Sequence, residues 1–165
     1  MTVSTSRKLM KLLSIVASMA PFKPNMLNLS VELGVSKNDL PGYLVYLEKA
    51  GMVGLLRDDT RGIRGLGKVE KVYVDNPSLM TVLAGGEPDK GNIRETFFYN
   101  QMRVRNCVTS SKISDFRIGD VTFEVGGRNK GRRQLKDAER GIVVKDDIEY
   151  PYPDTIPLWQ FGLNY

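Results

Sequence analysis

The sequence contains no histidine and a single cysteine, Cys107. The lack of histidine excludes a Ser-His or Cys-His dyad, an imidazole base and histidine metal ligands. A single thiol excludes an internal disulfide and a thiolate zinc cluster within one chain. Catalysis by these residues would therefore need carboxylates, lysine, tyrosine or a metal ion held by oxygen. Cys107 lies in an alternating apolar run, which predicts a buried, inert thiol.

Long apolar runs are also missing, since none approaches the ~20 residues that a membrane-spanning helix needs. Residues 7–20 are basic and then apolar, as in a signal peptide, but their leucines recur at the spacing of an amphipathic helix. We therefore expect a cytoplasmic protein with no membrane partner. The net charge of +5 permits a nucleic-acid partner without requiring one.

The first half of the chain has the pattern of a helix-turn-helix followed by a hairpin. A helix is expected over 7–20, a short helix that stops at Gly34, and a third that stops at Gly51. Strand-like runs follow at 52–57 and 69–74. This order predicts a winged helix domain over residues 1–84.

The loop between these two strands is rich in cations and glycine. It carries Arg57, Arg61, Arg64 and Lys68, which could lie along a phosphate backbone, or could simply form an exposed, soluble loop. Its glycines and lysine match the spacing of a nucleotide-binding P-loop. However, Val69 stands where a serine or threonine should hold magnesium, and no helix follows. The loop is therefore not expected to bind a nucleotide.

A polar, glycine-rich joint at 85–91 predicts a linker, so residues 92–165 form a second module. Its order is helix, three strands, helix, strand, which predicts an α+β or α/β domain. The expected elements are a helix capped by Asn92, strands at 103–109, 113–118 and 121–125, a helix at 132–140 and a strand at 141–144. The terminal apolar stretch, with Trp159 and Phe161, is expected to pack back on the core or, alternatively, to bind a protein partner.

In the middle of this second module, a group of carboxylates is followed by a run of cations. Asp115 and Glu124 lie on the second and third expected strands, and a basic run follows them: Arg128, Lys130, Arg132, Arg133 and Lys136. Paired carboxylates beside cations suit a divalent metal next to a phosphate backbone. The alternative is a surface hairpin followed by a solvated basic helix.

This order of elements resembles the PD-(D/E)xK nuclease-like fold. The whole chain is also similar to the C-terminal region of a family of bacterial and archaeal AAA+-type ATPases. In that family a winged helix and a degenerate nuclease-like module follow a P-loop ATPase domain, which this sequence lacks. The resemblance suggests a fragment or a stand-alone remnant. The matching segments are 33–36, 43–51, 71–77, 91–98, 114–116 and 122–127.

The resemblance implies roles for individual residues. Asp115 matches the aspartate of the motif, Glu124 its second acid and Glu95 the acid of the first helix. In an active member these oxygens would hold Mg²⁺, which would activate water. The lysine expected two residues after Glu124 is replaced by Gly126, although Lys130 could reach the same place. The glycine therefore predicts a weakened or lost active site.

Three functions follow as expectations. The first is a DNA-associated accessory module that is inactive as a nuclease, needs no cofactor, and contacts the backbone through the wing and the basic run. The second is an Mg²⁺-dependent DNA endonuclease that uses Asp115, Glu124 and Lys130. The third is a module that binds a protein partner such as an ATPase domain.

Overall fold

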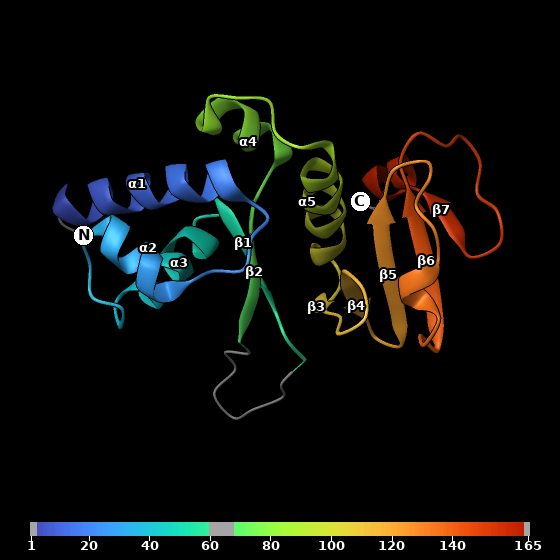
Figure 1. Cartoon of the computed structure of the whole chain (residues 1–165). Coiled ribbons are helices and arrows are strands. Elements are labelled where there is room, and N and C mark those ends of the chain that lie inside the picture. Colours follow the sequence, from blue (N-terminus) through green and yellow to red (C-terminus); the bar gives the residue numbers. More distant parts are fainter. Residues whose placement is uncertain (1–2, 60–67, 164–165) are drawn as a thin grey trace.

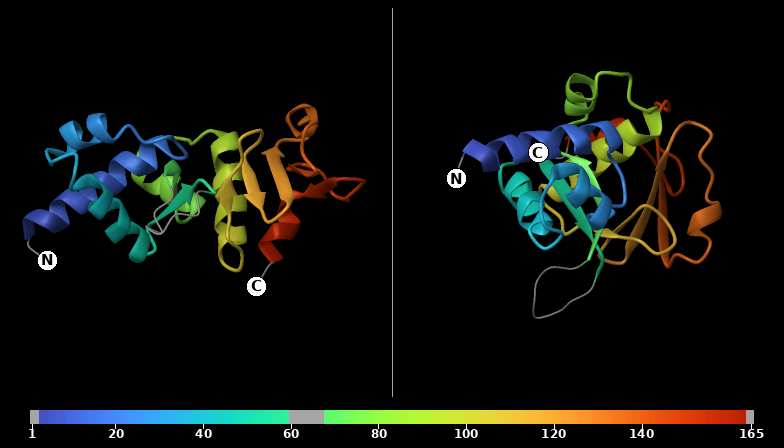
Figure 2. Two further views of the ribbon diagram at one scale, coloured as in Figure 1. Left: turned by 90° about the horizontal axis from the view of Figure 1, so that it is seen from below. Right: turned by 60° about the vertical axis from the view of Figure 1, so that its left-hand side comes forward.

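The structure is a computed structural model that describes residues 3–59 and 68–163 of the chain. It is a mixed α and β protein, and its described strands form one seven-stranded sheet in the order β2-β1-β3-β4-β5-β6-β7. Helices α1 to α3 lie on one side of the β1–β2 hairpin and α5 lies on the other (Figures 1 and 2). Among the described helices, none is both long and apolar enough to span a bilayer.

The first half forms as its sequence pattern predicts. Its elements are α1 (Val3–Met19), α2 (Met26–Leu33), α3 (Leu40–Lys49), β1 (Val53–Arg57) and β2 (Val69–Val74). Asn25 caps α2 by accepting from the amides of Leu27 and Asn28, and Gly34 ends it in the left-handed region at φ +68°. The antiparallel hairpin pairs Val53 with Val74. The three predicted helices and both predicted strands are confirmed.

The second half holds the rest of the sheet. Its elements, which follow α4 (Pro77–Ala84) of the first half, are α5 (Lys90–Arg103), β3 (Thr109–Ser110), β4 (Phe116–Ile118), β5 (Val121–Gly126), the 3₁₀ turn η1 (Arg133–Leu135), β6 (Arg140–Lys145), β7 (Thr155–Pro157) and the 3₁₀ segment η2 (Leu158–Leu163). Strands β4 and β5 are antiparallel, whereas β6 and β7 continue the sheet in parallel. One residue pair, Arg57 with Thr109, joins β1 to β3.

Three predictions around α5 are wrong. The expected strand at 103–109 is replaced by the end of α5 and an irregular segment, and only its last residue enters β3. Cys107 is therefore exposed rather than buried. The helix cap is Asp89, whose Oδ1 accepts from the amides of Gly91 and Asn92, so Asn92 lies inside the first turn.

The helix expected at 132–140 is also wrong, because only the short turn η1 forms there. Strands β5 and β6 run parallel, so the connecting chain must travel back along a strand of six residues, about 20 Å. The connection follows turns and the short η1 instead, and Leu135 anchors it by packing against Gly141.

The apolar core has two parts, and the β1–β2 hairpin contributes to both. Val53, Leu55 and Val72 belong to the cluster formed with α1 to α4. Leu56 and Tyr73 belong to the cluster formed with α5 and β4 to β6. Alternate side chains of a strand point to opposite faces, so the hairpin is covered on both sides. Residues 85–89 of the predicted linker 85–91 lie between α4 and α5, whereas 90–91 already belong to α5, and the two halves also share this hairpin.

Candidate functional site

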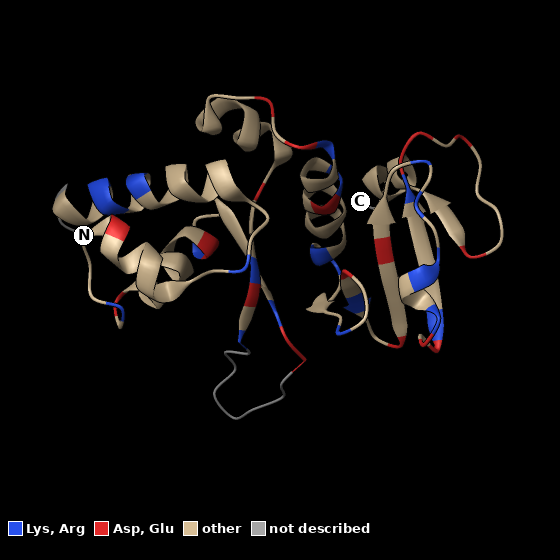
Figure 3. Ribbon diagram, viewed as in Figure 1, with Lys and Arg blue, Asp and Glu red and all other residues tan. Residues whose placement is uncertain are grey.

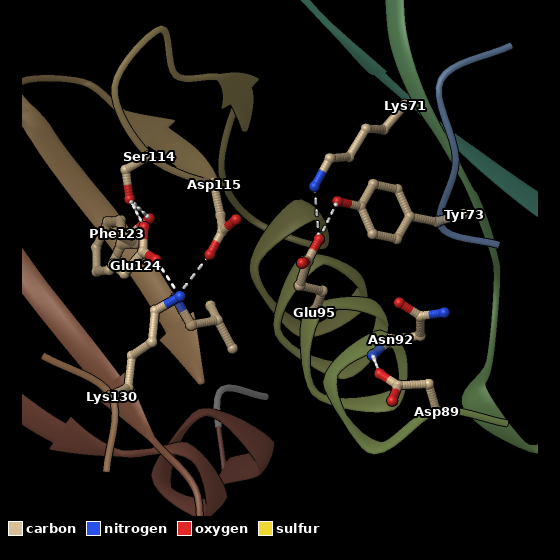
Figure 4. Close-up of polar contacts among 11 residues, drawn as sticks. Lys71, Tyr73, Asp89, Asn92, Glu95, Ser114, Asp115, Phe123, Glu124 and Lys130 are labelled. Atoms are coloured by element: carbon tan, nitrogen blue, oxygen red, sulfur yellow. Dashed lines mark hydrogen bonds and ion pairs between the residues drawn. The ribbon is translucent and has the colours of Figure 1, made fainter. Parts of the chain in front are cut away.

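Glu124 is a fully buried carboxylate at the centre of the candidate site. It lies on β5, which is covered on both faces, and its side chain is 1% exposed. Ser114 donates its hydroxyl to Oε2, and the Lys130 ammonium contacts Oε1 (Figure 4). The amide of Gln134 also abuts both oxygens, an arrangement that is satisfied when its NH₂ group faces them. The buried charge is therefore compensated from three directions.

Lys130 reaches Glu124 across a glycine. Its stem lies against Gly126, where a Cβ atom would stand 2.6 Å from both Cγ and Cδ of Lys130. The position where the resemblance expects lysine thus provides the space through which a later lysine reaches the same acid. Burial lowers the pKa of Lys130, but the contact with Glu124 and the charges of Asp115 and Glu95 outweigh it, so the pKa is raised overall.

Asp115 lies between Glu124 and Glu95 (Figure 4). Its Oδ2 accepts a hydrogen bond of 2.9 Å from the amide of Val125. Burial, then the charge of Glu95, raise the pKa of Asp115 to about 6, and the Val125 amide offsets this only in part. The carboxyl group is therefore close to half protonated in mildly acidic solution.

Glu95 is held by the first half of the chain. It projects from α5, and its Oε2 accepts from the Lys71 ammonium at 2.7 Å and from the Tyr73 hydroxyl at 3.2 Å, both on β2 (Figure 4). Burial, followed by the charge of Glu95, raises the pKa of Tyr73 well above its ordinary value, so the hydroxyl stays a donor. Glu95 thus joins α5 to the hairpin.

The three acids do not form a metal-binding group in this arrangement. No set of three or more acidic, cysteine or histidine side chains is placed to hold a metal ion within the described ranges 3–59 and 68–163. Glu95 faces Lys71, and both oxygens of Glu124 already have donors. Magnesium would need Lys130 or Gln134 to leave Glu124, so the residues do not fit the metal as they stand.

The basic run after β5 forms an exposed surface beside the buried acid. We call residues 126–136 the basic segment. Arg128, Arg132, Arg133 and Lys136 are all exposed, and their charges follow the chain in Figure 3. Arg132 pairs with Asp154. The side chains of Arg128 and Arg133 form no hydrogen bond or ion pair with any residue in the described part of the chain.

The cations predicted for the wing are arranged differently. Arg57 donates to both oxygens of Glu48, at 2.9 and 2.7 Å, so its guanidinium ties β1 to α3. Lys68 pairs with Glu70 at 3.1 Å. Arg61 and Arg64 fall outside the described residues.

Sequence reasoning missed several residues of the site. Ser114 and Gln134 gave no signal, because a serine beside a strand and a glutamine in a presumed helix are ordinary surface residues. Lys71 and Tyr73 lie far away in the sequence, in the other predicted module.

The two terminal aromatic residues predicted to pack on the core differ in the structure. Phe161 packs against the second core cluster, but Trp159 stays 52% exposed. No protein-family model matches the chain, and no curated protein or solved structure is significantly similar to it.

Proposed function

We propose that this chain is a DNA-associated module that contacts the phosphate backbone through the basic segment and whose nuclease-like site is not catalytic. The observation that carries the proposal is the contrast around Glu124. The acid is buried and fully paired, whereas Arg128 and Arg133 beside it are exposed and have no acidic partner in the described ranges.

The fold that we propose is a winged helix followed by a PD-(D/E)xK nuclease-like domain. The helices α1 to α3, the turn at Gly34 and the β1–β2 hairpin support the first assignment. Acids on α5, beside β4 and on β5, together with a parallel return to β6, support the second. We also propose, from the same arrangement of elements, that the chain is similar to the C-terminal region of AAA+-type ATPases.

The pairing of Glu124 argues against hydrolysis. A metal-dependent hydrolase presents carboxylate oxygens to the ion and keeps a position open for water or substrate. Here the second acid of the motif is closed off from solvent, and the acid of α5 is bound by Lys71. The same contacts are what a structural role requires, because a buried charge must be paired.

The exposed cations argue for phosphate contacts. Arginine presents a rigid fork of donors that matches phosphate oxygens, and binding releases the counterions of the nucleic acid. An arginine already bound to a carboxylate, as Arg57 is, contributes less. The basic segment is therefore the stronger candidate than the base of the wing.

The test is DNA binding measured by fluorescence anisotropy over a range of salt concentrations. Binding should weaken steeply as salt rises, and replacing both Arg128 and Arg133 by glutamine should reduce the salt slope by about 2. Arg105→Gln removes the same kind of exposed charge elsewhere and serves as the matched control. Binding that ignores salt, or that is unchanged in the double variant, would overturn the proposal.

One observation favours a second candidate, an Mg²⁺-dependent nuclease. Lys130, Glu124 and Asp115 meet in one place although the lysine is displaced in sequence. The protein and its Asp115→Ala variant should be incubated with supercoiled and linear DNA and Mg²⁺ or Mn²⁺. Cleavage that is lost in the variant would establish the nuclease. Equal cleavage in both, or none in either, would eliminate it.

A further inference from the structure

A second surface feature lies next to the basic segment and has no role so far. It is a cleft of about 490 Å³ between the start of α4, α5 and η2. Its lining includes Phe97, Asn100, Gln101, Arg94, Asp146 and Trp159. This volume is in the range of small-molecule sites, and apolar walls with a few polar groups are typical of them.

Trp159 gives the cleft an exposed aromatic wall on a fixed frame. It is the only tryptophan of the chain and is 52% exposed. The preceding residue, Leu158, is buried, and Phe161 packs edge-on against Phe98 with ring centroids 4.9 Å apart. An indole anchored in this way offers a stacking surface at little cost in conformational freedom.

Asn100 supplies an unused hydrogen-bond acceptor in the lining. It is only 9% exposed, and its Nδ2 donates to the Val74 carbonyl at 3.1 Å, which fixes the orientation of the amide. Its Oδ1 is shielded from solvent and accepts no hydrogen bond in the described part of the chain. A buried acceptor without a partner is uncommon, and a neighbouring side chain would have to move before a bound molecule could reach this oxygen.

The cleft and the basic segment are continuous. Arg94 lines the cleft, and its guanidinium lies so near Gly127 that a Cβ atom there would stand 3.2 Å from Nη1. The amide of Asp146, another lining residue, donates to the Gly126 carbonyl at 2.9 Å. Arg94 pairs with Asp146 at 2.8 Å and with Asp147 at 3.1 Å, so its charge offsets only part of the repulsion that these two acids exert on a nearby phosphate.

We propose that the cleft binds an unstacked base of single-stranded nucleic acid whose phosphates lie on the basic segment. Stacking on Trp159 would hold the ring, and an exocyclic amino group would donate to the side-chain oxygen of Gln101, which also lines the cleft. This proposal rests on the proposed function and adds to it a preference for single strands over duplex. A duplex keeps its bases stacked and paired, so it could use only the basic segment.

The single tryptophan makes the test direct, because emission excited at a wavelength that the seven tyrosines do not absorb reports on Trp159 alone. The probes are a short mixed-sequence DNA single strand, an abasic strand of equal length, and the matching duplex. The single strand should quench the emission, whereas the abasic strand should bind, as followed by anisotropy, without quenching. Trp159→Leu should weaken single-strand binding about five-fold or more and leave duplex binding unchanged, and Trp159→Phe should restore most of the loss.

Two failures are distinguishable. If the single strand binds but leaves the emission unchanged, and Trp159→Leu binds like the parent protein, the base-binding cleft is overturned and the proposed function stands. If neither single strand nor duplex binds at any salt concentration, the proposed function falls and this inference falls with it. Trp159 is half exposed, so its substitution should leave the fold intact, which a melting curve of each variant verifies.

Discussion

The stem of Lys130 lies so close to the Cα of Gly126 that any side chain at position 126 would overlap it. The glycine that breaks the expected motif and the lysine that reaches Glu124 are therefore one arrangement. A lysine at position 126 and Lys130 in its present place exclude each other. Lys130 can keep its contact with Glu124 only while position 126 is glycine.

Gly126→Ala is expected to lower the free energy of unfolding by roughly 1–3 kcal/mol, because the added methyl group displaces Lys130 from a buried carboxylate. Gly131→Ala is the matched control, since a Cβ there meets nothing within 4 Å. Its effect should stay within about 0.5 kcal/mol. Urea denaturation of both variants measures the difference, and equal stability would show that Lys130 does not depend on this space.

Lys130→Met tests the pairing itself. It leaves Glu124 buried with only Ser114 and Gln134 as donors, so the loss should approach the lower end of roughly 3–5 kcal/mol, because the lysine side chain is 35% exposed. Lys136→Met, at an exposed lysine without an ion pair in the described structure, should cost little. Adding Glu124→Gln to Lys130→Met should recover part of the loss, and no recovery would contradict the pairing.

Asp115 predicts a specific pH dependence of stability. Its pKa is about 6 in the folded protein and lies near 3.8 when unfolded, so between these values the folded state binds more protons. The contribution of this group is therefore fully present below about pH 4 and is lost as the pH rises through 6. Asp115→Asn removes the titration. The unfolding free energy of the variant should therefore increase by roughly 2 kcal/mol relative to that of the parent protein as the pH rises from 4.5 to 7.5. Melting curves of both proteins at these two pH values provide the comparison, and a constant difference would refute it.

The sequence predicts the local elements of this protein better than their assembly. Helices and strands of the first half follow apolar spacing and glycine stops, which act within a few residues. The strand expected at 103–109 and the helix expected at 132–140 failed for reasons that lie elsewhere in the chain. Residues 104–108 have no strand partner in the described sheet, and the chain between β5 and β6 follows turns around the buried Leu135 rather than a helix.

The candidate site shows the same limit. Asp115, Glu124 and Lys130 could be named from the residues, and the structure brings them together. The contact of Glu95 with Lys71 could not, because it depends on how the hairpin of the first half packs on α5. Nothing in the sequence distinguishes Arg57, bound to Glu48, from an arginine free to bind phosphate.

Substitution of Arg57 should therefore affect mainly stability, and substitution of Arg128 mainly DNA binding. Arg57→Gln breaks a two-bond contact with Glu48 at the junction of α3 and β1 and should cost roughly 1–3 kcal/mol in unfolding free energy. It should leave the salt slope of DNA binding unchanged, because the guanidinium is already committed to a carboxylate. Arg128→Gln should do the reverse, with stability within about 0.5 kcal/mol of the parent and a salt slope reduced by about 1. Denaturation and anisotropy titrations on the same two variants measure both quantities. A reduced salt slope in Arg57→Gln would show that the wing contacts DNA. An unchanged salt slope in Arg128→Gln would show that Arg128 of the basic segment does not.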